Sequence, residues 1–284
     1  MKLRTIAVLL AALTLTIIMT GCAQEQKSAF DKPVIETWTE TVDEKQVKFM
    51  TIDGIIVHET DPAKQPLPPI VTPGTNSCGD KAGTAPSDAV VLFDGTAEAM
   101  ENWTNTKGEK TKWIYVDGAM ECVKKSGYIQ SKEKFGSCQL HIEWATPANI
   151  KGSGQGRGNS GVFLMGKYEV QVLNSYINET DPDRQAGAIY KQHIPLVNAS
   201  RKPGKWQVYD IIFKAPGFDE SGKQLMPGII TLFHNGVLVQ NHVEIKGPTR
   251  AHNEMLDITD TELPLMLQDH KSKVSYRNIW IRKL

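Results

Sequence analysis

The sequence predicts an all-β protein, a jelly-roll β-sandwich, on three observations. Short apolar segments recur at regular spacing from residue 87 to 284, with almost no helical periodicity. Asp-Gly and Asn-Gly pairs, which favour tight hairpin turns, separate several of these segments. Within the segments apolar and polar residues alternate, as they do in strands that bury one face. A single sandwich can occupy ~200–250 residues, so it accounts for the whole stretch.

The expected strands can be placed in order along the chain. Asp117-Gly118 and Asn235-Gly236 mark hairpin turns, and Met165-Gly166-Lys167 joins two strands of a central hairpin. Pro147 ends the strand before that hairpin, because proline cannot donate to a sheet ladder. The strands are expected within residues 90–95, 113–123, 138–145, 157–175, 206–215, 228–245, 263–267 and 274–282.

The first residues have the features of an export signal. Lys2 and Arg4 precede an apolar run, residues 6–18, that is too short for a comfortable membrane-spanning helix. The run ends at Gly21-Cys22, which resembles the signal box of bacterial lipoproteins, where the cysteine is lipidated. We therefore expect residues 1–21 to be a signal peptide and Cys22 to anchor the chain to the cell envelope, at the outer membrane facing the periplasm or the cell surface. A plain secretory signal with a chance cysteine is the alternative.

Residues 22–86 are expected to form a tether followed by an extended strap over the main domain, residues 87–284. Residues 47–58 indicate a short hairpin that turns at Asp53-Gly54. The stretch that follows is rich in proline, which excludes a central strand.

Three further cysteines lie in the body of the chain, and an exported protein can form disulfides. Cys122 and Cys138 lie near two expected strands and could face each other, while Cys78 could pair with either. An odd number leaves one of them free. Their spacing does not match a zinc site.

The charge balance excludes one class of partner. The chain has 32 basic and 32 acidic residues, so its formal net charge is zero. No basic stripe indicates nucleic acid. A small or neutral partner is favoured.

Candidate site residues follow from strand alternation. In the second strand of the central hairpin, Glu169 and Gln171 point away from the face that carries Tyr168 and Val170. Two other strands present similar pairs on one face. If the three strands are neighbours, carboxylates, amides and imidazoles gather on one sugar-binding surface formed by His141, Glu143, Glu169, Gln171, Gln268 and His270.

Each candidate also has a plain structural explanation. A histidine at a strand end, such as His141 or His270, is often merely solvated, and an outward Glu143 is common on solvated sheets. The Glu169–Gln171 pair between apolar neighbours is less easily explained this way. The glycine-rich loop at residues 152–158 lacks a phosphate-binding ending and suits a substrate-contacting rim, with Arg157 and Asn159 beside it.

Several motifs together resemble the 3-keto-disaccharide hydrolase domain family, whose fold is similar to concanavalin A-like lectins and glucanases. The resemblance implies cleavage of glycosides whose sugar is oxidised to a ketone at C3. Asn174 and Lys191 depart from the family pattern, which commonly has Asp and Gly there. The resemblance covers residue 87 to the C-terminus and is carried by residues 87–96, Trp103, 158–164, 168–173, 188–190, 206–213, 267–270 and 276–279.

The chemistry can also be argued from the residues. A retaining glycosidase needs two carboxyl groups ~5 Å apart, whereas the strand from Glu169 to Asn174 supplies one carboxylate. A 3-keto sugar needs only a base for its acidified C2 proton, an acid for the leaving oxygen and a donor at the ketone.

Residue roles follow from that scheme as hypotheses. Glu169 or His270 is the expected base, and Glu143 the acid or a hydroxyl ligand. The remaining candidates are expected to bind substrate: His141, Arg157, Asn159, Gln171 and Gln268. No cofactor is required by the spacing, although a divalent cation at a His/Glu cluster would stabilise the enolate.

Two other functions stay open. The same fold often serves as a non-catalytic carbohydrate-binding module. An ordinary glycoside hydrolase would pair Glu143 with Glu169 and cut unoxidised glycosides.

Overall fold

The computed structural model describes residues 34–42, 44–52, 55–59, 68–249 and 261–284. The chain forms two compact units, residues 1–69 and 70–284. Cys22 lies outside the described residues, as do residues 1–21. Within the described part, no helix has the length and apolar character needed to cross a membrane.

The N-terminal unit contains an antiparallel sheet of β1 (Ile35–Val42), β2 (Lys45–Ile52) and β3 (Ile55–Glu59), in that order. The register places Ile52 opposite Ile55, so the expected hairpin at residues 47–58 is confirmed. Strand β1 falls where the sequence analysis expected an irregular tether. Its β-branched residues explain the difference, because Ile, Thr and Val favour extended backbone.

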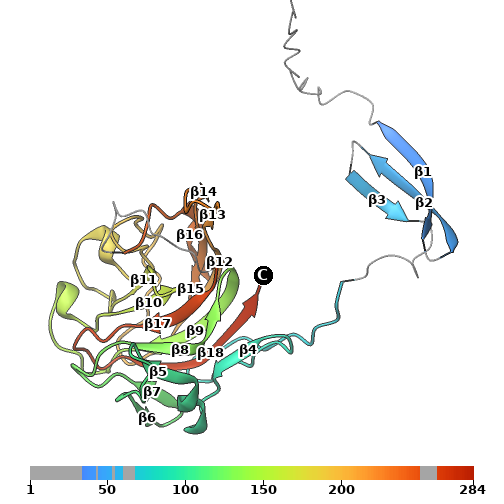
Figure 1. The fold of residues 1–284 in the computed structure, drawn as a ribbon. Coiled ribbons are helices and arrows are strands. Elements are labelled where there is room, and N and C mark those ends of the chain that lie inside the picture. The colour runs from blue at the N-terminus through green and yellow to red at the C-terminus, as the bar shows by residue number, and fades with distance from the viewer. Residues whose placement is uncertain (1–33, 43, 53–54, 60–67, 250–260) are drawn as a thin grey trace, which may run out of the picture. The chain divides into compact units, whose positions relative to one another are not determined.

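The C-terminal unit is a β-sandwich, which confirms the expected fold class (Figure 1). Its smaller sheet is built from β5 (Trp103–Asn105), β8 (Ile129–Phe135), β10 (Ser160–Leu164), β11 (Tyr168–Val172) and β17 (Leu263–Leu267). The strands lie in the order β11–β10–β17–β8–β5, and neighbouring strands are antiparallel.

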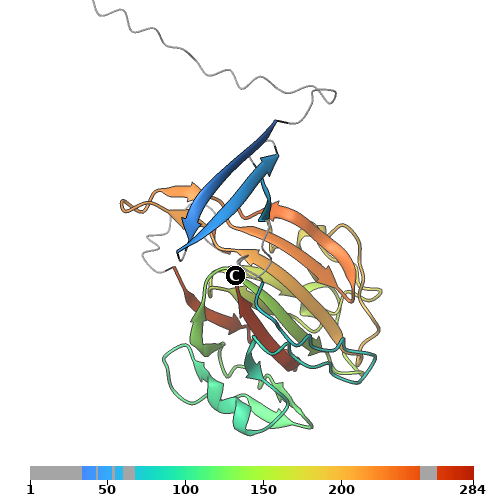
Figure 2. The ribbon, with the colours of Figure 1, turned by 90° about the vertical axis from the view of Figure 1, so that its right-hand side faces the viewer.

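The larger sheet packs against the smaller one. Its strands are β4 (Val90–Phe93), β6 (Ile114–Val116), β7 (Ala119–Glu121), β9 (Cys138–Ala145), β12 (Gln207–Lys214), β15 (Ile229–His234), β16 (Val237–Glu244) and β18 (Ser275–Lys283). The order is β16–β15–β12–β9–β18–β7–β6, with β4 also paired to β18. Figure 2 shows β12 and β15 in orange beside β9 in green and β18 in red. Smaller elements are η2 (Glu98–Asn102), η3 (Gly154–Gly156), η4 (Pro182–Arg184), β13 (Gly217–Phe218) and β14 (Gln224–Met226).

The inner faces of the two sheets form one hydrophobic core. The long strands β9 and β12 contribute every second residue to it, as alternation requires. The larger sheet supplies Leu140 and Tyr209, and the smaller sheet supplies Val162 and Val170. Fully burying one such aliphatic side chain stabilises the fold by roughly 1.5–3 kcal/mol. The residues of opposite parity, including all the candidates on β9 and β11, therefore face outward from the sandwich.

Strands β5 and β8 lie outside the strand segments expected from the sequence. Strand β8 reads Ile129-Gln-Ser-Lys-Glu-Lys-Phe135, with three consecutive exposed charged residues and a register irregularity against β17. The shift in register interrupts the period of two, so alternation no longer marks the strand. Strand β5 is only 3 residues long.

Residues 70–87 run along the outer face of the larger sheet, where they appear as a teal trace in Figure 2. Backbone bonds fold the segment on itself, with Thr75 N donating to Thr84 O at 3.1 Å and Ser87 N to Thr72 O at 3.0 Å. Arg277 of β18 donates to the carbonyl of Asp80 at 2.7 Å. This segment therefore covers part of β9 and β18.

The three cysteines of the described part are free thiols, so none of the pairings considered for them occurs. Burial raises the pKa of Cys138 to about 12. Burial also raises the pKa of Cys122, and the nearby Asp269 carboxylate adds to that shift. Cys78 is exposed.

Candidate active site

The outer side of the smaller sheet carries a row of polar residues, which we call the polar face: Gln155, Asn159, Glu169, Gln171 and Gln268. The row crosses three strands, because Gln171 of β11 pairs with Gly161 of β10 and Gln268 N donates to Gly161 O at 3.0 Å. Four of the five side chains belong to residues that are buried, and Gln155 is half-buried. Buried polar groups on an outward face are typical of a binding site rather than of a solvated sheet.

Glu169 is held on this face along the edge of β11 that does not pair with β10. Its backbone N–H donates to Thr249 Oγ1 at 2.9 Å, and its carbonyl accepts from Tyr190 N at 3.1 Å. The residue is 3% exposed. A Cβ at Gly161 would lie 2.5 Å from Glu169 Oε1 and 2.9 Å from the Phe163 ring, so the carboxylate lies over the glycine. Glycine is required there to leave room for the carboxylate.

Gly161→Ala should therefore impair the site although it removes no polar atom. The new methyl group must displace the Glu169 carboxylate or the Phe163 ring, and a misplacement of ~1 Å can cost about 10²-fold in rate. We expect turnover of the substrate proposed below to fall by at least tenfold.

Gly156→Ala is the matched control for Gly161→Ala. No atom lies within 4 Å of a Cβ at Gly156, and its backbone is not left-handed. The two variants are compared by steady-state kinetics and by thermal unfolding. Equal activities would show that Gly161 has no special steric role.

The amides of the polar face bond to one another and leave two acceptors unpaired. Gln171 Nε2 donates to Gln155 Oε1 at 3.2 Å and lies 3.4 Å from Asn159 Oδ1. Gln268 Nε2 donates to the hydroxyl of Tyr128 at 2.8 Å. Within the described residues, the buried Oε1 atoms of Gln171 and Gln268 have no hydrogen-bond partner. Two orphaned acceptors suit the hydroxyl donors of a sugar.

Arg157 and His270 lie at the margins of the polar face. Arg157 Nη1 donates to the carbonyl of Ile177 at 3.1 Å, which ties the glycine-rich loop to the loop after β11. His270 follows Gln268 by two residues, just beyond the end of β17, and its side chain is exposed. Asn159 donates to the backbone carbonyl of Gln155 at 2.9 Å.

The expectation that all six strand candidates share one surface is wrong for His141 and Glu143. Both lie on β9 of the larger sheet, with Leu140 and Ile142 of the same strand in the core. Their side chains therefore point outward on the opposite side of the sandwich from Glu169. The error arises because alternation assigns a face within a strand but not the sheet that the strand joins.

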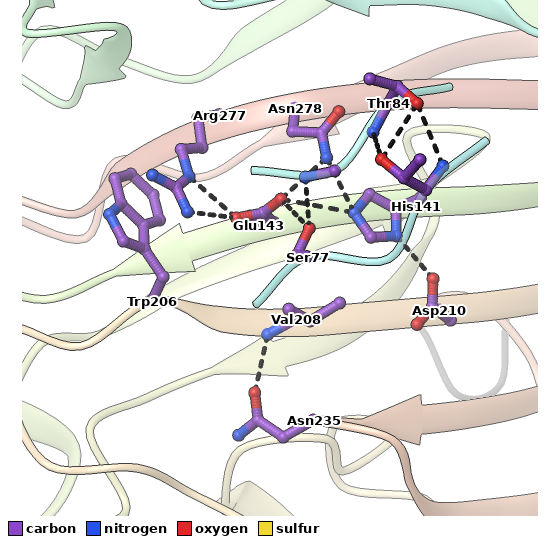
Figure 3. Close-up of polar contacts among 12 residues, drawn as sticks. Ser77, Thr84, His141, Glu143, Trp206, Val208, Asp210, Asn235, Arg277 and Asn278 are labelled. Atoms are coloured by element: carbon purple, nitrogen blue, oxygen red, sulfur yellow. Dashed lines mark hydrogen bonds and ion pairs between the residues drawn. The ribbon is translucent and has the colours of Figure 1, made fainter. Parts of the chain in front are cut away.

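His141 and Glu143 belong to a dense polar network (Figure 3). His141 Nδ1 lies 2.6 Å from Asp210 Oδ1, and its Nε2 lies 3.6 Å from Glu143 Oε1. The Glu143 carboxylate also accepts hydrogen bonds from Ser77 Oγ at 2.5 Å, Asn278 Nδ2 at 2.7 Å and Arg277 Nε at 2.8 Å. The guanidinium of Arg277 in turn lies 4.1 Å from the Trp206 ring centroid.

The hydrogen bonds and ion pairs of this network determine the protonation states of His141 and Glu143. Burial alone would lower the pKa of His141, but its hydrogen bonds to Asp210 and Glu143 outweigh burial and raise the pKa to about 9. Burial alone would raise the pKa of Glu143, but the contacts with His141, Ser77, Asn278 and Arg277 lower it to about 2. Glu143 is therefore ionised at neutral pH, and as a 0% exposed carboxylate it does not fit the role of a general acid.

The same geometry excludes Glu143 and Glu169 as the pair of catalytic carboxyl groups that an ordinary glycosidase needs. Stacked sheets lie ~10 Å apart, and here the two side chains point away from each other. The Glu143 and Glu169 carboxyl groups are thus farther apart than the ~5–9.5 Å that such enzymes need. Across the described residues, no three His, Cys, Asp or Glu side chains group as metal ligands would.

Sequence reasoning missed several residues that complete these clusters. Gln155 lies inside the glycine-rich loop that was expected to form a rim, and only the fold brings its amide to Gln171. Tyr128 precedes the unpredicted strand β8 and packs against Phe163 with ring centroids 5.9 Å apart. Arg277 lies in a family motif, but no pattern linked it to Glu143.

Comparisons with known proteins agree with this fold. A crystal structure of a candidate glycosyl hydrolase from Parabacteroides distasonis ATCC 8503 is 47% identical, with a TM-score of 0.69 over 78% of this chain and 93% of that one. A second candidate glycosyl hydrolase of that organism is 19% identical, with a TM-score of 0.51 over 69% of this chain and 94% of that one, which indicates a shared fold alone. No curated protein matches the sequence.

The family expected from the sequence motifs is confirmed by a match over nearly the whole sandwich. The match spans residues 88–282, which include every residue of the polar face. The chain belongs to the family of 3-keto-alpha-glucoside-1,2-lyase-like domains.

Proposed function

We propose that the protein cleaves 3-keto-glycosides on the polar face, with Glu169 as the general base. The observation that carries this proposal is the buried carboxylate of Glu169 beside two amide oxygens, Gln171 Oε1 and Gln268 Oε1, that have no hydrogen-bond partner in the described part of the chain. Family membership and the similarity to a candidate glycosyl hydrolase support a carbohydrate-active function. The family description itself names a 3-keto-glucoside lyase.

The reaction needs only one carboxylate. The C3 ketone acidifies the proton on C2, and Glu169 takes that proton while the electron pair forms an enolate. Expulsion of the aglycone oxygen breaks the C1–O bond and forms a C1–C2 double bond conjugated with the C3 ketone. The leaving oxygen takes up one proton. Addition of water across the double bond then yields the free 3-keto sugar, whereas release before this addition makes the enzyme a lyase.

The other residues of the polar face have binding roles in this scheme. The free oxygens of Gln171 and Gln268 accept hydrogen bonds from sugar hydroxyls, and the amide of Asn159 orients Gln171. His270, two residues beyond Gln268 and exposed to solvent, protonates the leaving oxygen. An amide or main-chain N–H donates a hydrogen bond to the enolate oxygen. Electrostatic stabilisation of this kind usually contributes most to the rate enhancement of such reactions.

The proposal is tested by offering the purified protein a chromogenic glucoside and, separately, its 3-keto derivative. We expect aglycone release from the keto substrate alone, with His270→Ala slowing it by ~10²–10⁴-fold. Poor leaving groups should be affected more than good ones, because only they need protonation. Release from the unoxidised glucoside would contradict the proposal.

A non-catalytic sugar-binding module is the second candidate. The polar face contains four amide side chains and a single carboxylate, a composition suited to holding hydroxyl groups. Binding of the keto-glycoside without aglycone release, at any pH between 5 and 9, would favour this function.

A further inference from the structure

Two buried tyrosines reach across the core from the larger sheet to the strands that carry the polar face. Tyr209 of β12 donates its hydroxyl to the carbonyl of Gln171 at 2.7 Å. Tyr276 of β18 donates to Ser160 Oγ at 2.7 Å, and Ser160 Oγ donates to the carbonyl of Gln268 at 2.6 Å. Both rings are completely buried. Each set of hydrogen bonds ends on the backbone of a residue whose outward amide oxygen has no hydrogen-bond partner among the described residues.

Together with other hydrogen bonds, these bonds fix the main chain at Gln171 and at Gln268. The Gln171 carbonyl also accepts from Gly187 N at 3.0 Å, so its two lone pairs are both used. The backbone N–H of Gln268 donates to Gly161 O, so the main chain of this residue is held at both its N–H and its carbonyl. Because Ser160 both accepts and donates, the bonds in its chain polarise and strengthen one another.

A hydroxyl in the middle of a hydrophobic core is costly unless it is paired. Phenylalanine would fill the same volume at either position without that requirement. Burial raises the pKa of Tyr209 and of Tyr276 well above the ordinary value for a tyrosine, so both hydroxyls are neutral donors at neutral pH. The two hydroxyls thus form lasting hydrogen-bonded connections between the sheets, and we call Tyr209 and Tyr276 the struts.

We propose that Tyr209 and Tyr276 are positioning residues that hold, through Gln171 and Gln268, the substrate-binding amides of the polar face. Neither tyrosine touches the substrate. Their hydroxyls fix the peptide planes behind the two amides, and those planes determine where Oε1 points on the other side of the sheet. The catalytic part of this inference rests on the proposed function.

The test uses Tyr209→Phe and Tyr276→Phe, with Tyr168→Phe as the matched control. Tyr168 is also a buried core tyrosine on β11, packed on Phe213, but among the described residues no hydrogen bond is found for its hydroxyl. Each variant of the whole protein is assayed for kcat and KM on the 3-keto-glycoside across pH. Backbone carbonyl ¹³C and side-chain amide ¹⁵N signals of the two glutamines are recorded without substrate.

We expect kcat to fall about tenfold or more in each strut variant, since small misplacements of substrate-orienting groups have large effects on rate. The pH profile should stay unchanged. The Gln171 carbonyl and amide signals should move only in Tyr209→Phe, and those of Gln268 only in Tyr276→Phe. Ser160→Ala should reproduce Tyr276→Phe, which covers the case in which one strut variant folds poorly.

Unchanged glutamine signals with a lower melting temperature would overturn the proposal and leave the tyrosines a purely structural role. Unchanged kcat with shifted signals would overturn its catalytic part. If the unmodified protein cleaves no keto-glycoside, the proposed function fails. The ligand-free signals then still decide whether the struts position the amides.

Discussion

Replacing Glu169 by glutamine is expected to slow cleavage of the 3-keto-glycoside by several orders of magnitude. The substitution keeps the shape of the side chain over Gly161 but removes the only carboxylate of the polar face and with it the base for the C2 proton. General base catalysis contributes ~10²–10⁴-fold, so kcat should fall by that factor. Binding should persist, because the neighbouring amides are untouched. Steady-state kinetics and calorimetric titration with the keto-glycoside measure the two quantities.

Glu179→Gln is the matched control, because it makes the same chemical change in the exposed loop after β11. Its activity should stay within a factor of two of the parent protein. Solvent exchange at C2 gives a second readout. The parent protein should exchange the C2 hydrogen of a keto sugar that has no leaving group, and Glu169→Gln should not. Exchange at the parent rate in Glu169→Gln would rule out Glu169 as the base.

Replacing Glu143 by glutamine is expected to destabilise the sandwich rather than to stop its chemistry. The change leaves the Arg277 guanidinium and the protonated His141 without their shared buried carboxylate. Removing one partner of a buried ion pair typically costs ~3–5 kcal/mol. A loss of that size lowers the melting temperature by roughly 10 °C for a domain of this size. Turnover per folded molecule should be nearly unchanged at 25 °C.

Glu133→Gln provides the comparison for Glu143→Gln, because Glu133 forms an exposed ion pair with Lys283 at 3.5 Å. Exposed pairs contribute ~0–1 kcal/mol, so this variant should unfold close to the parent temperature. Loss of turnover in Glu143→Gln without loss of stability would restore Glu143 as a catalytic candidate.

The pH dependence of unfolding tests the same network. The pKa of Glu143 is lowered from 4.5 to about 2, so its contribution is complete above pH 4.5 and is lost as the pH falls toward 2. The pKa of His141 is raised from 6.5 to about 9, so its contribution is complete below pH 6.5 and is lost as the pH rises through 9. In Glu143→Gln the acid-side loss should shrink.

The sequence by itself determined the fold class, most strands and the face of each candidate. The alternation around Glu169 and Gln171 needed only the period of two that every strand obeys. Asn235-Gly236 and Asp117-Gly118 marked hairpins for a similarly local reason, since both residues of each pair have positive φ in the structure. Local stereochemistry is sufficient for such features, because neighbours in sequence determine them.

Only the tertiary structure decided which residues share a site. Glu143 and Glu169 follow the same local pattern, yet β9 and β11 join different sheets, and their carboxylates face opposite sides of the sandwich. Gln155 reaches Gln171, and Tyr209 supports it from behind, through contacts 16 and 38 residues apart in sequence. Such pairings depend on how two whole sheets stack on a shared core. That stacking is a property of the complete chain, and no short pattern of side chains encodes it.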